Sequence, residues 1–221
     1  MRLTIYGRSV VLKVLIVTLA IDIIAILVPV AIVKVILLCL SVFLISFTLY
    51  FFRDPIRHVP DEIKNTDILS PGDGKVMLIE EIKEKDFLKS NAKLIGIFLS
   101  PLNVHVNRIP VTGKVEYFKY VKGEFIAAYD HKSSERNERT IIGISISNTS
   151  LKVLFKQIAG FVARRIVCEL KQGDNVNAGE KFGMIKFGSR VDVIVPENSK
   201  IMVSVNQKVV GGQTILAEVS A

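Results

Sequence analysis

Residues that build metal and disulfide sites are scarce in this chain. Its 221 residues include no tryptophan, two cysteines and three histidines. Cys39 and Cys168 have no second cysteine close in sequence, which excludes a CxxC zinc site and a disulfide framework and suits a reducing compartment. His58, His105 and His131 are scattered and form no HExxH pattern. We therefore expect neither a metal centre nor a secreted, disulfide-stapled fold.

Acidic residues are also few relative to basic ones. Lys and Arg number 29 against 21 Asp and Glu, which gives a formal net charge of +8. Such a balance suits either nucleic acid or an anionic lipid surface. Because no basic–aromatic motif or helical reader module stands out, we expect no nucleic-acid partner and favour a membrane surface.

Hydrophobic residues, by contrast, are in excess and make up 50% of the chain. They concentrate in two segments, 14–28 and 35–52, on either side of Pro29, and the only charged residues of this region are Asp22 and Lys34. A membrane-spanning helix needs about 20 apolar residues, with about 17 as the lower limit. The segments therefore predict a tight helical hairpin that either spans the membrane twice or is re-entrant. Asp22 is costly there unless it has a function, lies near an interface or pairs with a lysine.

The hairpin defines a first domain, residues 1–52, and leaves residues 53–221 as a second. The apolar stretch is too long for a signal-peptide core and lacks a small-residue cleavage site, so we keep it in the mature protein. Basic flanks stay cytoplasmic, and a hairpin returns both ends to the same side. We expect a cell-membrane protein whose second domain faces the cytoplasm. The flanking cations are Arg2, Arg8, Lys13, Arg53 and Arg57.

The second domain is predicted to be mainly β. Short alternating or β-branched runs are broken by glycine, proline and asparagine, at spacings typical of β-rich domains. The segment 80–90 is expected to form one short helix, and the polar segment 131–139 (HKSSERNER) a loop. The expected strands lie at 94–99, 114–120, 140–147, 151–157, 162–170, 191–195, 201–205 and 214–219.

Residues 171–183 place glycines at the corners of a predicted strand–turn–strand unit. Their sequence, KQGDNVNAGEKFG, resembles the hammerhead turn of biotinyl and lipoyl barrel-sandwich domains. Those domains carry a modified lysine within Met-Lys-Met or Asp-Lys-Ala, and neither tripeptide is present. The resemblance therefore predicts a barrel-sandwich element without a swinging-arm function.

Four motifs carry the candidate chemistry. Taken singly, each has a simpler interpretation: Gly188–Ser189 is a common turn pair, Asp73 between two glycines is a turn former, and His105 is a satisfied strand residue. Their joint presence changes that interpretation. The motifs are FFRDP (51–55), SPGDGKV (70–76), SPLNVHVNRIP (100–110) and FGSRVD (187–192).

In order and spacing these motifs resemble the short branch of the phosphatidylserine decarboxylase proenzymes, a pyruvoyl-dependent family that includes archaetidylserine decarboxylase-like proteins. The resemblance runs from about Phe51 to Val219, and the hydrophobic hairpin ahead of it also suits the family. It implies a membrane phospholipid substrate: a serine phospholipid loses carbon dioxide and becomes the ethanolamine phospholipid. Ester-linked and archaeal ether-linked tails leave no distinguishing motif.

The resemblance also implies self-cleavage at Gly188–Ser189. The serine attacks the preceding carbonyl, an ester forms, and elimination frees the upstream chain. A pyruvoyl cofactor remains at position 189, and residues 1–188 and 189–221 become two chains. A serine needs a base to take its proton, and a histidine held by a carboxylate is the usual arrangement.

His105 and Asp73 are the candidates for that activating pair. The pyruvoyl group forms a Schiff base with the substrate amine and accepts the electrons released when carbon dioxide leaves. The product carbanion then needs a proton, which suits a histidine near neutral pH. We assign this step to His105 as well.

Arg108 departs from the longer, bacterial branch of the family, which has a second histidine three positions after the first. Either His105 serves both self-cleavage and decarboxylation, or Arg108 has another role, such as holding phosphate or carboxylate. Arg53, Arg57 and Lys75 are further candidates for phosphate contacts, although the two arginines also fit as positive-inside anchors.

Two other functions compete with this one. A non-catalytic, membrane-anchored barrel-sandwich adaptor normally has a single span and long coiled-coil heptads, and neither is seen here. An unprocessed, inactive relative looks almost identical in sequence. Assembly into a homo-oligomer is compatible with each of these interpretations.

Overall fold

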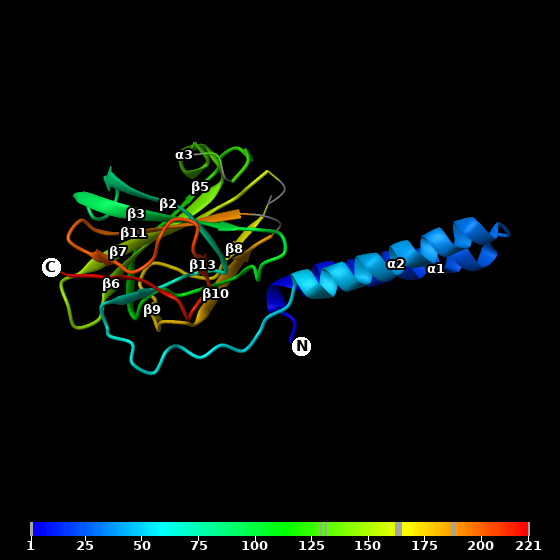
Figure 1. Cartoon of the computed structure of the whole chain (residues 1–221), viewed down its shortest axis with the longest axis horizontal. Coiled ribbons are helices and arrows are strands. Elements are labelled where there is room, and N and C mark those ends of the chain that lie inside the picture. The colour runs from blue at the N-terminus through cyan, green and yellow to red at the C-terminus, as the bar shows by residue number, and fades with distance from the viewer. Residues whose placement is uncertain (1, 129, 131, 162–164, 187–188, 221) are drawn as a thin grey trace. The chain divides into compact units, whose positions relative to one another are not determined.

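The structure is a computed structural model that describes residues 2–128, 130, 132–161, 165–186 and 189–220 (Figure 1). The chain divides into two compact units, Met1–Ile56 and Arg57–Ala221. Each unit is described by itself.

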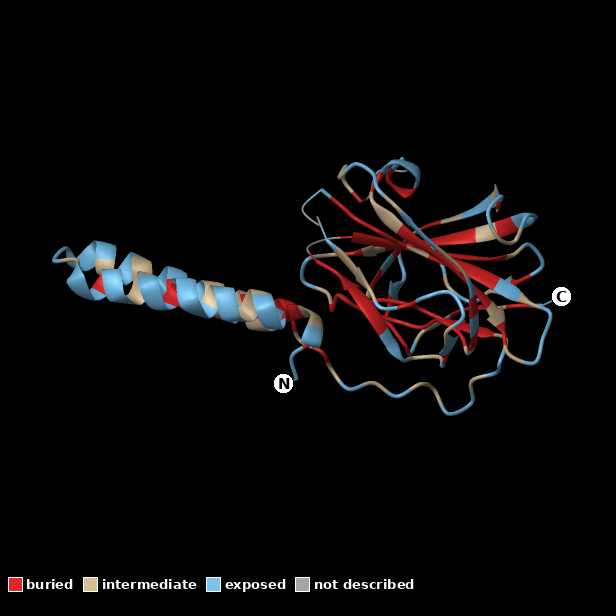
Figure 2. Ribbon diagram, turned by 180° about the vertical axis from the view of Figure 1, so that it is seen from behind, coloured by how far each residue is buried: buried red, intermediate tan, exposed pale blue. Residues whose placement is uncertain are grey.

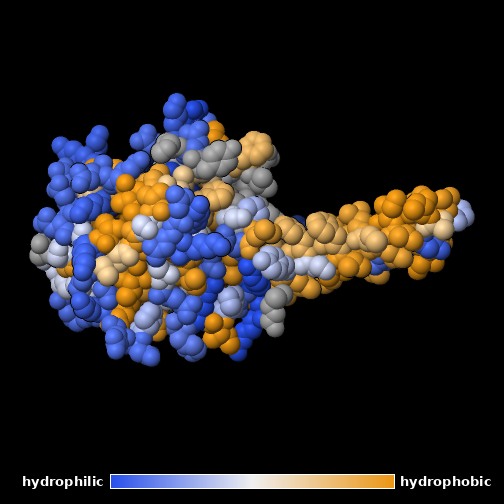
Figure 3. All heavy atoms as spheres, in the orientation of Figure 1, coloured by the Kyte–Doolittle hydropathy of each residue, from blue (hydrophilic) through white to orange (hydrophobic). Residues whose placement is uncertain are grey.

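The first unit is a helical hairpin. After the 3₁₀ turn η1 (Ile5–Gly7), α1 spans Arg8–Leu27 and α2 spans Ala31–Phe51. Both helices are long and apolar enough to cross a membrane. Apolar side chains cover the hairpin on the face seen in Figure 3, and Figure 2 shows that most of its residues are exposed. A helix that is hydrophobic all round belongs in an apolar medium, so the predicted hairpin of apolar helices is confirmed.

Backbone hydrogen bonds close the open end of the hairpin. The Thr4 N–H donates to the Phe52 carbonyl oxygen (2.9 Å), and the Asp54 N–H donates to the Arg2 carbonyl oxygen (2.8 Å). At the other end Pro29 disfavours helical backbone in the residue before it, which explains why α1 stops at Leu27. The entry and the exit of the hairpin therefore lie at the same end.

The second unit is built from three sheets whose strand pairs, among the described residues, are all antiparallel. The large, curled sheet has the order β13-β2-β3-β11-β7-β6-β5-β9, and the small sheets are β1-β14-β12 and β4-β10-β8 (Figure 1). The predicted mainly-β fold is confirmed. The bounds are β1 Asp67–Leu69, β2 Gly74–Lys83, β3 Asn91–Leu99, β4 Val106–Arg108, β5 Gly113–Val121, α3 Ser133–Arg136, β6 Arg139–Ile146, β7 Lys152–Ile158, β8 Ile166–Cys168, β9 Asn175–Val176, β10 Lys181–Ile185, β11 Ser189–Pro196, β12 Lys200–Ile201, β13 Lys208–Val209 and β14 Ile215–Glu218.

The main core lies between the large sheet and the two small ones. Successive side chains of a strand point to opposite faces, and Val191 and Val193 of β11 belong to the main hydrophobic cluster. The same cluster contains Leu216 of β14 and both Phe182 and Ile185 of β10. The small sheets therefore cover one face of the large sheet, and the central strands are buried along most of their length (Figure 2).

Residues 80–90, predicted as a helix, instead complete β2 and then turn, so this prediction is wrong. In β2, Val76 and Leu78 are buried whereas Lys75 is exposed, which is the period of a strand. The strand pairs with β3 from Lys75 to Lys83. Pairing within the sheet overrides the helix propensity of glutamate and lysine.

The polar segment 131–139, predicted as a loop, contains the short helix α3, and β6 begins at its last residue. Ser133 and Ser134 are buried rather than solvated. The Ser133 hydroxyl donates to the Ala128 carbonyl oxygen (3.1 Å), and the Ser134 hydroxyl donates to Asp192 (2.6 Å). These contacts order the segment, whereas His131 lies outside the described residues.

Two further predicted strands differ in extent from those observed. The strand predicted at 201–205 is only Lys200–Ile201, and within the described part of 162–170 only Ile166–Cys168 is a strand. Two of the predicted corner glycines are confirmed: Gly173 and Gly179 have φ of 100° and 82°, a conformation that costs glycine little. Gly183, in contrast, lies inside β10.

The loop after β2 depends on one buried carboxylate, Glu84, which is 5% exposed. Its oxygens accept the backbone N–H groups of Asp86, Phe87 and Leu88 at 2.6–2.9 Å. Burial alone raises the pKa of Glu84, but these donors outweigh burial and lower the pKa. A lowered carboxyl pKa gives stability that is present above the unfolded-state pKa and is lost as pH falls through the folded-state pKa.

We expect Glu84→Gln to lower the free energy of unfolding by about 1–3 kcal/mol at neutral pH, because a neutral amide with one acceptor oxygen replaces the carboxylate. The difference from the wild type should shrink in acid, where the wild-type carboxyl is also protonated. Urea unfolding at neutral and acidic pH measures both effects. Glu81→Gln, at an exposed position of the preceding strand β2, is the matched control. Equal neutral-pH stability of Glu84→Gln and the wild type would contradict this role.

Candidate active site

Two predicted site residues lie at the ends of connections between the same pair of sheets. In the large sheet β3 and β11 are neighbours, and in one small sheet β4 and β10 are neighbours. Residues 100–105 join β3 to β4, and residues 186–188 join β10 to β11. The two connections therefore begin and end on neighbouring strands. They lead to two of the predicted site residues, His105 and Ser189.

Ser189 is the first residue of β11 and is fully buried. It pairs in register with Leu99 of β3, and Arg190 pairs with Ile158 of β7. Its side chain shares a face with Val191 and therefore points toward the main core. Among the described residues, the Ser189 Oγ has no hydrogen-bond partner. Leaving a buried hydroxyl without a hydrogen bond costs about 1–3 kcal/mol.

His105 directly precedes β4 and is also fully buried. The neighbouring Val106 pairs with Met184 of β10. This register places His105 beside Ile185, at the start of the connection that leads to Ser189. The structure therefore brings the predicted histidine and serine to the same region, although β4 and β11 belong to different sheets.

A chain of buried polar side chains lies next to them. The Thr140 hydroxyl donates to the Gln157 Oε1 (2.8 Å), and the Gln157 Nε2 donates to the Asn107 Oδ1 (2.8 Å). These bonds fix the orientation of the Asn107 amide. Its Nδ2 has no hydrogen-bond partner among the described residues, and a Cβ on Gly72 would come within 3.3 Å of it. Asn107 thus provides an oriented, buried N–H donor.

Asp73 lies in the turn before β2, at the same end of the large sheet. The Arg57 Nη2 donates to its Oδ2 (2.6 Å), and the Arg57 Nη1 pairs with its Oδ1. The Gly211 N–H also donates to Oδ1 (2.8 Å). Within the described part of the chain, Asp73 contacts Arg57 and Gly211 rather than His105. Arg57, expected as a phosphate contact or an anchor, is the partner of this carboxylate.

Arg108 is 6% exposed and its Nη1 donates to the Gly179 carbonyl oxygen (2.9 Å). A Cβ added to Gly212 would lie only 2.7 Å from the Arg108 Cδ, so the arginine side chain packs closely against this glycine. Neighbouring strand residues point to opposite faces, so Arg108 and Asn107 diverge. These contacts tie β4 to two turns and favour a structural role for Arg108.

Lys186 is a buried cation, 7% exposed, in the connection that leads to Ser189. The backbone N–H of Lys186 donates to the Arg165 carbonyl oxygen (3.3 Å). Burial, and secondly the charge of Arg165, lower the pKa of Lys186. A cation at this position suits a phosphate or carboxylate group close to the serine.

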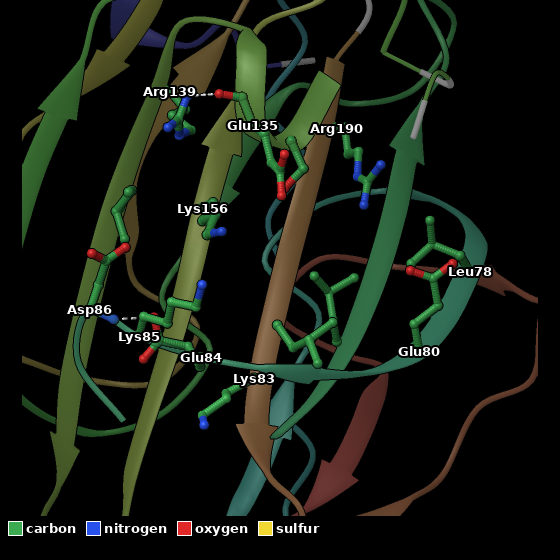
Figure 4. A pocket seen from close by; sticks show the side chains of 14 residues that line it. Leu78, Glu80, Lys83, Glu84, Lys85, Asp86, Glu135, Arg139, Lys156 and Arg190 are labelled. Carbon is green, nitrogen blue, oxygen red and sulfur yellow. Dashed lines mark hydrogen bonds between the residues drawn. The ribbon is translucent and has the colours of Figure 1, made fainter. Parts of the chain in front are cut away.

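The opposite face of β11 is fixed by a buried ion pair. The Arg190 Nε donates to the Asp192 Oδ1 (2.5 Å), and the Ser134 hydroxyl donates to the Asp192 Oδ2 (2.6 Å). Figure 4 shows Arg190 among the charged side chains, such as Lys156 and Glu135, that line a cavity of about 360 Å³ on this face. None of the three described site residues lines that cavity. The ion pair therefore holds the strand that carries the serine without entering the site.

Sequence reasoning missed Asn107, Gln157, Thr140 and Lys186 as functional candidates. The buried side chains of Thr140 and Gln157 have no spacing signature, and their signal was a polar residue at an inward position of an alternating run. Asn107 stands in the 100–110 motif without a distinguishing pattern of its own, and Lys186 lies outside the strands. Gly188, predicted as the other half of the cleavage site, lies outside the described residues.

Comparison with known proteins gives one consistent result. The profile of the family described as phosphatidylserine decarboxylase matches residues 44–217. The chain is similar to the phosphatidylserine decarboxylase proenzyme of Chlorobium limicola, with 51% identity over 81% of this chain and 82% of the relative. It is 46% identical to the proenzyme of Prosthecochloris aestuarii over 96% and 95% of the two chains. The proenzyme of Cytophaga hutchinsonii is 45% identical over 82% and 81%.

Cys168 provides a test of the packing beside β10, because it pairs in register with Gly183 of that strand. Burial raises the pKa of its thiol to about 11, from an ordinary value of 9.0. The thiolate is the reactive form. In a Cys39→Ser variant we therefore expect Cys168 to react with a disulfide reagent about 100-fold more slowly near neutral pH than after unfolding in urea. The rate should rise steadily up to about pH 11, whereas equal rates in the folded and unfolded states would show that the thiol is not shielded.

Proposed function

Because this chain belongs to the phosphatidylserine decarboxylase family, we propose that it cuts its own backbone between Gly188 and Ser189 and then decarboxylates a serine phospholipid. The products are the ethanolamine phospholipid and carbon dioxide. The observation that carries the proposal is the buried Ser189 Oγ, which lacks a described hydrogen-bond partner at the start of a central strand.

Self-cleavage begins with the Ser189 Oγ attacking the carbonyl carbon of Gly188. His105 takes the hydroxyl proton and returns it to the backbone nitrogen of Ser189 as the peptide bond breaks, which leaves Gly188 joined to the serine as an ester. Loss of the Ser189 Cα proton then expels the Gly188 carboxylate. Water replaces the nitrogen of residue 189, which leaves as ammonia, and a ketone remains.

Asn107 stabilises the negative charge that develops on the attacked carbonyl oxygen. Its Nδ2–H is buried, and the Gln157 hydrogen bond fixes its direction. An oriented donor of this kind acts in a water-excluded site without reorganisation and is worth about 100- to 1,000-fold in rate.

The residues of the site fit a pyruvoyl group at position 189. The position is buried at the first residue of a strand paired on both sides, and a buried donor and a histidine lie in the same region. When formed, the group supplies an electron sink for the loss of carbon dioxide. His105 donates the proton that replaces the carboxylate, and Lys186 binds the phosphate or carboxylate of the substrate.

Asp73 supports this chemistry by holding the turn that faces Asn107. Its ion pair with Arg57 and its hydrogen bond from Gly211 join three segments of the domain around Gly72. If Asp73 exchanged Arg57 for His105 as its partner, Asp73 would become the second member of the activating pair. The apolar hairpin keeps the domain at the membrane, and its basic flanks support a cytoplasmic location of the domain.

Ser189→Ala removes the nucleophile, so we expect a single uncut chain in place of residues 1–188 and 189–221. Intact mass spectrometry measures this, and Edman sequencing should find the shorter wild-type fragment blocked. Ser199→Ala is a matched control, because Ser199 is also buried with an Oγ that has no described partner. It should cut normally. An uncut wild-type chain would contradict the proposal and favour an adaptor or an inactive relative.

Asn107→Asp keeps the acceptor for Gln157 but removes the N–H donor. We expect self-cleavage to slow by about 100- to 1,000-fold, measured as the fraction of cut chain over time after synthesis in a cell-free system with detergent. Thr140→Val loosens only the far end of the hydrogen-bonded chain and should slow cleavage less, by about tenfold or below. Wild-type rates in folded Asn107→Asp would exclude a role for the amide in cleavage.

A further inference from the structure

The end of the large sheet that carries Ser189 also exposes two large apolar side chains. Ser189 is flanked by β3 and β7, whose chains leave the sheet at this same end, after Leu99 and Ile158. Three residues beyond these strand ends, Leu102 and Phe161 are 62% and 70% exposed. We call these two side chains the apolar rim.

Single exposed apolar residues are common and need no explanation, so the placement of the rim is the informative observation. At the opposite end of β7 the exposed loop residues are Asn148, Thr149 and Ser150. At the opposite end of β3, Phe87 and Leu88 pack against the domain instead of standing exposed. Large exposed apolar side chains therefore flank the serine end of these strands and not the other.

Charge near the rim complements a lipid surface. Arg165 is exposed. Its carbonyl oxygen accepts the backbone N–H of Lys186 (3.3 Å), so Arg165 lies beside the connection to the serine. The segments 100–105 and 159–165 contain no aspartate or glutamate. Apolar tips beside cations match the boundary between acyl chains and anionic headgroups.

We propose that the apolar rim inserts into the bilayer at the headgroup boundary, with Arg165 at the level of the lipid phosphates. The serine end of the domain then rests on the membrane, and a lipid headgroup reaches the site while its tails stay in the bilayer. This inference rests on the proposed function for its choice of partner. The hairpin anchors the chain, whereas the rim orients the second unit.

The absence of tryptophan makes the insertion directly measurable. Leu102→Trp and Phe161→Trp each place a single fluorescent reporter on the rim, and Ser150→Trp places one at the other end of β7 as the matched control. The full-length proteins are reconstituted into phosphatidylcholine vesicles with and without phosphatidylserine, containing brominated acyl chains as quenchers. We expect blue-shifted, quenched emission at 102 and 161 and water-like, unquenched emission at 150. Rim reporters that behave like the 150 control would overturn the proposal.

A kinetic arm tests the consequence for the substrate. Leu102→Ser with Phe161→Ser should raise the KM for phosphatidylserine in vesicles by about tenfold, because two apolar anchors no longer enter the lipid. The kcat for a short-chain, monomeric serine phospholipid should stay within about twofold. Equal KM values in vesicles would refute the orienting role. Failure of the proposed function is distinguishable, since it appears as an uncut chain without activity while the fluorescence still reports insertion.

Discussion

The position of β11 between β3 and β7 is the constraint on which the site depends. Hydrogen bonding on both edges fixes the start of this strand, so the Ser189 side chain has one direction in which to point. Alternation then divides the roles of the strand between its faces. One face presents a serine to a buried polar region, and the other buries the Arg190–Asp192 pair. A buried ion pair contributes little net stability but resists displacement, because breaking it leaves an uncompensated charge. The ion pair on one face of β11 thereby helps to fix the position of Ser189 on the other.

Local patterns in the sequence were enough to predict the hairpin, the mainly-β domain and two of the corner glycines. The helix expected at 80–90 failed because glutamate and lysine favour helices locally, whereas β3 offers a complete row of hydrogen-bond partners that no local pattern reveals. Ser189 and His105 were accessible through motifs. The Asn107–Gln157 contact was not, because the two residues are separated by 50 positions and meet only when the sheets assemble. The pairing of Asp73 with histidine stays a prediction; in the structure the Asp73 oxygens bind Arg57 and Gly211, which no local pattern reveals.

The polar groups of the site share one energetic property. Ser189 and Asn107 each keep a buried polar atom without a described hydrogen-bond partner, and both lie next to well-packed aliphatic residues such as Leu99. Such groups destabilise a fold, and proteins retain them where strain or chemistry requires them. The large apolar core offsets their cost. The first inward position of β11 is therefore a buried hydroxyl without a described partner, whereas the later inward positions of the strand are valine.

The connection between β10 and β11 has one more consequence, for the lifetime of the protein. Before cleavage, residues 186–188 join β10 to β11, so the chain folds as a single molecule. After the proposed cleavage, β11 would belong to a separate short chain that is held between β3 and β7 by hydrogen bonds and packing alone. If the mature protein unfolds, the two pieces must find each other again in dilute solution, and loop closure no longer assists them. The proposed cleavage would therefore make the persistence of the folded protein depend more strongly on its unfolding rate.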